Sequence, residues 1–168
     1  MMRYLFLIIT LCVCSCGLRP YSEFNTNSHI LTQISLGTIK GEQQHLIKNY
    51  LLNALNIYDQ HNEIKYLLDV TVISQSNDSV VQKDSTVLEK TITINAAYVL
   101  KAKNNLTPLT QGTITLKSNF TSTASPYGSF VQEKKSYADA LKLTVSDIKR
   151  NLIIYFAKNS KDKNENSH

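Results

Sequence analysis

Apolar side chains in the C-terminal third of the chain recur at steps of three and four residues, as one stripe of an α-helix does. Ser125-Pro126 resembles a helix cap followed by proline at the first helical position, and Ser129 with Gln132 forms a second capping pattern. We therefore predict a helix from about Ser129 to Ala157, followed by a frayed polar tail over residues 158–168. The stripe consists of Tyr137, Leu141, Val145, Ile148, Leu152 and Tyr155.

A second helical stripe lies nearer the N-terminus and predicts a helix from about Glu42 to Tyr58. Before it, apolar residues among Thr, Gln and Ser over His29 to Ile39 predict a first strand, with Gly37 and Gly41 marking its end. The helical stripe consists of Leu46, Ile47, Tyr50, Leu51, Ala54, Leu55 and Tyr58.

Between the two predicted helices the apolar period changes to two, which is typical of half-buried strands. The alternation predicts strands at Ile64–Ser74, Val87–Lys101 and Gly112–Phe120. The polar run Ser74–Ser79, with Asn77-Asp78 at its centre, predicts a turn. Asn104-Asn105, with Pro108 just beyond, predicts the next one. Three alternating strands joined by short polar turns indicate an antiparallel meander.

The order strand, helix, three strands, helix predicts an α+β fold. We expect a two-layer sandwich, with two helices packed on one face of a four-stranded, largely antiparallel sheet. Residues 29–157 are long enough and apolar enough to form a single domain.

The N-terminus has the pattern of an export signal. The positively charged start Met1-Met2-Arg3 precedes an apolar run from Tyr4 to Val13, which is too short to span a bilayer. Val13-Cys14-Ser15-Cys16 then resembles a bacterial lipobox, with a small residue before the last cysteine. We therefore predict a signal peptide at residues 1–15, lipidation of Cys16 and a tether at residues 16–28. An ordinary cleaved signal or an anchored apolar N-terminus are the alternatives.

The cysteine content is consistent with this prediction, because all three cysteines lie between Cys12 and Cys16. The mature chain would keep one, so it would contain no internal disulfide. A Cys-x-Cys-x-Cys metal site is a weak alternative, since no partner His or Cys is nearby.

Composition and motifs exclude several functions. The net charge of +5 would permit nucleic-acid binding, but an exported chain would not meet the nucleic acid of the cell. No phosphate-binding loop or nucleophile elbow occurs. We therefore predict no enzyme activity, no metal and no cofactor. The four histidines are far apart and have no ligand spacing: His29, His45, His61 and His168.

Segments at both ends of the mature chain carry a family resemblance. Cys16-Gly17-Leu18-Arg19-Pro20-Tyr21 resembles the mature start of the lipopolysaccharide-assembly lipoprotein LptE family. Gly112–Phe120, Ser125–Phe130 and Tyr137–Ile148 are similar to the last strand and C-terminal helix of its alphaproteobacterial members. Phe120-Thr121-Ser122 departs from the family, which often has a Tyr-Asn pair there.

The resemblance implies a lipid-anchored protein on the periplasmic face of the outer membrane. It would plug an LptD-type β-barrel, assist its assembly and help deliver lipopolysaccharide to the cell surface. The family's lipid contacts, at basic residues near strand ends, imply Lys83 and Lys117 here as lipid-binding candidates. Two alternatives remain: an auxiliary lipoprotein of an envelope lipid ABC transporter, and an envelope hydrolase whose site is assembled only by folding.

Overall fold

The computed structural model describes residues 28–57, 63–81, 87–123 and 125–165. The order of elements is a short helix α3 (Ser28–Leu31), strand β1 (Ile34–Lys40), helix α4 (Gln44–Leu55), strands β2 (Tyr66–Val81), β3 (Val87–Ala102) and β4 (Pro108–Thr121), and helix α5 (Pro126–Glu165). The predicted signal peptide, the lipidation site Cys16 and almost all of the predicted tether lie outside the described residues.

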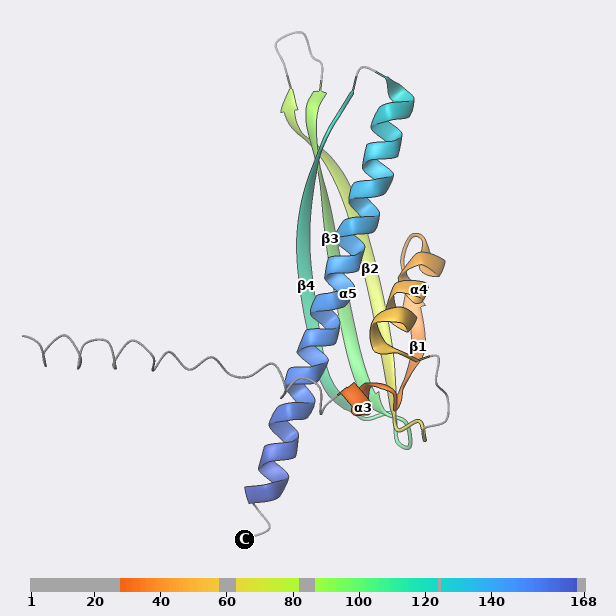
Figure 1. The fold of residues 1–168 in the computed structure, drawn as a ribbon, viewed down its shortest axis with the longest axis vertical. Helices are drawn as coiled ribbons and strands as arrows, with labels where there is room; N and C mark the ends of the chain where they lie inside the picture. The colour runs from red at the N-terminus through yellow and green to blue at the C-terminus, as the bar shows by residue number, and fades with distance from the viewer. Residues whose placement is uncertain (1–27, 58–62, 82–86, 124, 166–168) are drawn as a thin grey trace, which may run out of the picture.

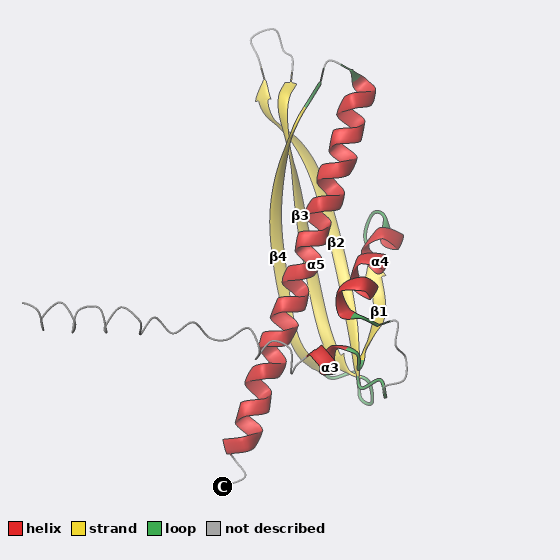
Figure 2. Ribbon diagram, in the orientation of Figure 1, coloured by secondary structure: helices red, strands yellow, loops and turns green. Residues whose placement is uncertain are grey.

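The four strands form one sheet in the order β1-β2-β3-β4. β1 runs parallel to β2, and α4 makes the crossover between them, whereas β2, β3 and β4 pair as an antiparallel meander. Figure 1 shows α5 lying along the length of the sheet, with α4 beside it. The predicted α+β class, with helices layered on a largely antiparallel sheet, is confirmed (Figure 2).

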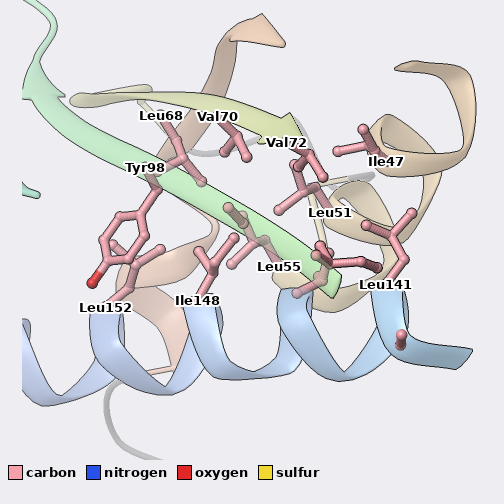
Figure 3. Close-up of a cluster of buried hydrophobic side chains, with 14 of the residues drawn as sticks. Ile47, Leu51, Leu55, Leu68, Val70, Val72, Tyr98, Leu141, Ile148 and Leu152 are labelled. Carbon is pink, nitrogen blue, oxygen red and sulfur yellow. The ribbon is translucent and has the colours of Figure 1, made fainter. Parts of the chain in front are cut away.

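The core lies between the sheet and the helices. Even-numbered residues of β2 and β3, such as Leu68, Val70 and Leu100, are buried on one face of the sheet. The helical stripes meet them, with α4 and α5 also in contact with each other (Figure 3). The helical residues at this interface that are at most 1% exposed are Ile47, Leu51, Leu55, Leu141, Ile148 and Leu152, together with Thr144.

On the face of the sheet that the helices cover, one position of β4 has room only for glycine. A Cβ at Gly112 would lie 2.6 Å from the hydroxyl oxygen of Tyr98, its partner on β3. Tyr98 is 5% exposed, so its ring cannot simply rotate into solvent.

The predicted turn at Ser74–Ser79 is wrong. β2 continues to Val81, and Asn77 and Asp78 pair with Thr91 and Lys90 of β3. These polar residues can stay in a strand because their backbone groups bond to β3 while their exposed side chains remain in water. Side-chain composition therefore does not mark the end of this strand.

Other element boundaries also differ from the prediction. The predicted first strand begins with a helical turn, α3, closed by a hydrogen bond from Gln33 N–H to Ile30 O. β4 begins at Pro108, before the predicted start at Gly112. The C-terminal helix begins at Pro126 and continues to Glu165, past Ala157 and into the predicted tail.

Candidate functional site: the open face of the sheet

The face of the sheet that is turned away from the helices is not covered by any described element. Its residues are the odd-numbered positions of β2, β3 and β4, in register across the three strands. We call them the open face. Its exposed members are Thr71, Ile73, Gln75, Asn77, Ser79, Ala97, Gln111, Thr113, Thr115, Lys117, Asn119 and Thr121.

Hydroxyl and amide side chains bond to one another across the open face. Thr115 Oγ1 donates to Asn95 Oδ1 at 2.7 Å, and Thr91 Oγ1 donates to Asn119 Oδ1 at 2.9 Å. Ser79 and Thr91 also share a hydrogen bond. Cross-strand pairs of this kind order the side chains and leave further donors and acceptors directed outwards. The face can therefore bind a polar surface through many neutral hydrogen bonds.

An ion pair on this face joins β2, β3 and β1. Asp69 Oδ2 accepts from Lys101 Nζ at 2.6 Å, and Asp69 Oδ1 accepts from the backbone N–H of Thr38 at 2.7 Å. Thr38 donates to a side chain because β1 has one extra residue between its pairings at Leu36 and Ile39, a β-bulge. Burial alone would raise the pKa of Asp69, but the hydrogen bonds from Lys101 and Thr38 outweigh it and lower the pKa.

The structure places one of the two lysines that the sequence singled out. Lys117 lies on the open face, exposed, opposite Thr93 of β3. It has no ion-pair partner among the residues the structure describes. Lys83 lies outside the described residues, and lipid binding by the two lysines stays a prediction.

A second feature is a cleft of about 580 Å³ on the helix side of the sheet. Its walls are the polar half of β2, including Ser74 and Ser76, and the first turns of α5. Gly41, with φ of 140°, approaches β2 so closely that a Cβ would lie 2.4 Å from Val72 O, and this brings the next residue, Glu42, to the end of the cleft.

Polar groups at this end of the cleft are bonded to one another. Ser74 Oγ donates to Glu42 Oε2 at 3.0 Å, and Tyr137 Oη donates to Glu42 O at 3.4 Å. Burial, and then the charge of Glu42, raise the pKa of Tyr137. Phe130 of α5 also lines the cleft although it is 60% exposed.

Sequence reasoning found neither the cleft nor the Asp69–Lys101 pair. The pair has a weak signal, a carboxylate and an ammonium group at outward-facing positions of neighbouring predicted strands. The cleft has none, because the predicted turn removed the half of β2 that forms its wall.

The described residues offer no candidate metal site. No group of His, Cys, Asp or Glu in the described ranges is arranged to hold a metal ion. His45 lies exposed on α4, while His61 and His168 are outside the described residues. In the same ranges, no helix is both long and apolar enough to cross a bilayer.

The sequence matches no protein-family model and no curated protein. The fold, in contrast, is similar to several solved structures. One is a protein of Caulobacter crescentus CB15 that is named as a lipoprotein, with a TM-score of 0.63, 17% identity, and coverage of 80% of this chain and 97% of that one.

Two further structures are similar over comparable lengths. A minor lipoprotein from Acinetobacter baumannii has a TM-score of 0.55 and 13% identity, covering 72% of this chain and 90% of its own. An uncharacterized lipoprotein B from Nitrosomonas europaea has a TM-score of 0.56 and 13% identity, covering 76% and 88%. At these identities the similarity establishes a shared fold.

Proposed function

We propose that the protein is a lipid-anchored component of the bacterial outer membrane that binds an LptD-type β-barrel as a plug. In this role it assists assembly of the barrel and helps deliver lipopolysaccharide to the cell surface. The observation that carries the proposal is the open face, which is rich in Thr, Asn and Gln across three strands and has no covering element among the described residues.

The open face has the chemistry that a plug needs. The lumen of an outer-membrane barrel is polar, so a protein inside it must offer hydrogen-bonding groups over a broad area. Thr, Asn and Gln do so without the cost of removing charges from water. The ion pair on this face, between Asp69 and Lys101, is already neutralised internally.

Two independent observations support the membrane part of the proposal. Cys16 follows a short apolar run and a small residue, as a lipidated cysteine does. The fold is that of three bacterial proteins named as lipoproteins. The resemblance of Cys16–Tyr21 to the LptE family then selects this barrel-binding role among the functions of lipoproteins.

Depletion of the protein in its native bacterium tests the proposal. Correctly folded barrel in the outer membrane should fall, and the outer membrane should become permeable to large antibiotics, because unplugged barrels fail to assemble. Restoring the wild-type gene is the control. Unchanged barrel levels together with normal permeability would contradict the proposal. Co-purification with an inner-membrane ATPase and periplasmic lipid-shuttle proteins would favour the role in an ABC transporter instead.

A further inference from the structure

The cleft on the helix side of the sheet lies against an unpaired strand edge. β1 pairs with β2 only as far as the register Lys40↔Thr71, whereas β2 continues to Val81. Over the second half of β2, β3 is the only strand partner among the described residues.

The backbone groups that face this edge can be identified by alternation along β2. Lys65 O accepts from Lys103 N–H, on the side of β3, whereas Tyr66 N–H donates to Gln33 O, on the side of β1. The pairing of β2 with β3 is then continuous from Tyr66 to Asp78. Even-numbered residues of β2 therefore direct their N–H and C=O groups away from β3. Ser74 and Ser76 are two such residues, and no described backbone group bonds to them on that side.

The side chains around this edge set the chemistry of an occupant. Glu42 and Glu133 line the cleft with the single cation Lys134, so its lining has an excess of one negative charge. Ile92 forms an apolar floor that is 3% exposed, and Phe130 forms an exposed apolar wall. A backbone edge, an apolar wall and an acidic end together are complementary to an extended peptide that carries a basic side chain.

We propose that the cleft binds an extended polypeptide segment, which adds a strand to the free edge of β2 at Ser74 and Ser76. An apolar side chain of the segment packs against Phe130, and a Lys or Arg side chain lies near Glu42 and Glu133. This surface lies at the edge of β2 on the helix side and shares only Gln75 with the open face. The proposal therefore goes beyond the binding of a barrel and can fail or hold independently of it.

The other edge of the sheet supplies a matched comparison. Ala102 N–H donates to Thr107 O, so even-numbered residues of β3 direct their N–H groups towards β4. Beyond the register shift at Leu100 they pair with even-numbered residues of β4, so odd-numbered residues of β4 direct their N–H groups to the outer edge of the sheet. Thr113 is such a residue. It is exposed, and no cleft in the described part of the chain includes it.

Peptide selection tests the proposal with the lipidated protein held in nanodiscs. A phage-displayed library of short random peptides is selected on the protein, and the enriched peptides are synthesised. We expect alternating sequences with an apolar and a basic residue. Hydrogen exchange of the Ser74 and Ser76 amides should slow when such a peptide is bound.

Substitutions then locate the binding. Ser76→Pro removes an N–H that the sheet does not use, and proline is tolerated at such edges, so it should weaken peptide binding about tenfold without unfolding the protein. Glu133→Lys should weaken binding several-fold, most strongly at low salt. Ser76→Ala, which keeps the N–H, and Thr113→Pro should bind peptide as the wild type does.

Three results would overturn the proposal. The first is the absence of enriched peptides, and the second is peptide binding that is unchanged in Ser76→Pro. The third is displacement of the peptide by laurate, a small amphiphile, together with protection of Phe130 from hydrogen exchange. That result would make the cleft a site for small amphiphiles. If Ser76→Pro does not fold, the exchange rates of the Ser74 and Ser76 amides in the wild type still decide, because unchanged rates on peptide addition would exclude strand addition.

Discussion

Asp69 on β2 accepts a 2.6 Å hydrogen bond from the ammonium group of Lys101 on β3, and its second oxygen accepts the N–H of Thr38 on β1. One carboxylate thereby connects three strands at the end of the sheet where the parallel and antiparallel pairings meet. Its side chain is 23% exposed, so the pair is only partly screened by water.

This carboxylate should make stability depend on pH. The folded-state pKa of Asp69 is lowered, so its contribution to the free energy of unfolding is complete above the unfolded value of about 4 and is lost as pH falls through the folded value. Asp69→Asn should cost about 1–2 kcal/mol at neutral pH and less in acid. Urea unfolding of both proteins from neutral pH into acid measures this. An equal cost at every pH would contradict the ion-pair assignment.

Substitutions on the buried face of α5 should lower the stability of the protein more than substitutions on its exposed face. Leu141 is fully buried between the sheet and α4, whereas Leu143, two residues later, is 58% exposed. Leu141→Ala should lower the free energy of unfolding by about 2–5 kcal/mol because it leaves a cavity, and Leu143→Ala should change it by less than about 0.5 kcal/mol. Equal costs in thermal or urea unfolding would mean that α5 packs through a different face.

Lipidation of Cys16 is testable by mass spectrometry of the protein purified from membranes. We expect the mature chain to begin at Cys16 with a diacylglyceryl thioether and usually an amide-linked acyl chain. Two or three acyl chains should hold the protein on the membrane, whereas one gives only marginal binding. Cys16→Ala should block this modification. An unmodified N-terminus, or a mature chain beginning elsewhere, would exclude the anchor.

The sequence predicts the elements of this fold better than it predicts their ends. The stripe around Leu141 and the alternation around Ile94 mark burial, and both elements exist where the pattern places them. The far half of β2 has no such mark, because its side chains at Gln75, Asn77 and Ser79 face water. Strand pairing there depends on backbone hydrogen bonds to β3, which a side-chain pattern does not reveal.

The candidate sites depend on this missing half of β2. Once the strand continues to Val81, the open face gains Gln75 and Asn77, and the cleft gains its wall at Ser74 and Ser76. A prediction that ends the strand at Ser74 contains the polar faces of β3 and β4 but lacks these two residues of the open face and the cleft.

Direct contact with lipopolysaccharide is the prediction that concerns Lys83 and Lys117. Lipopolysaccharide carries phosphates, so changing both lysines to Asp should weaken its binding to the purified protein at low salt. Because one exposed ion pair contributes up to about 1 kcal/mol, the two changes are made together. Lys48, exposed on α4, provides the control substitution Lys48→Asp. Unchanged binding in the double variant would remove both lysines from the lipid site.

The central claim is that the open face binds a β-barrel, and Ala97 provides the most direct test. Ala97 is exposed at the centre of this face, between Thr71 and Thr113 on the neighbouring strands. Ala97→Arg places a long charged side chain there without removing a described contact, and Ala97→Ser is the matched small polar control. Both variants should unfold at the same temperature as the wild type within a few degrees.

The measurement is the amount of LptD-type barrel that co-purifies with each protein from detergent-solubilised outer membranes. The account predicts that wild type and Ala97→Ser retain the barrel in equal amounts, whereas Ala97→Arg retains about tenfold less, because a buried unpaired charge would oppose docking. A barrel that is absent from the wild-type preparation, or retained equally by Ala97→Arg, would contradict it.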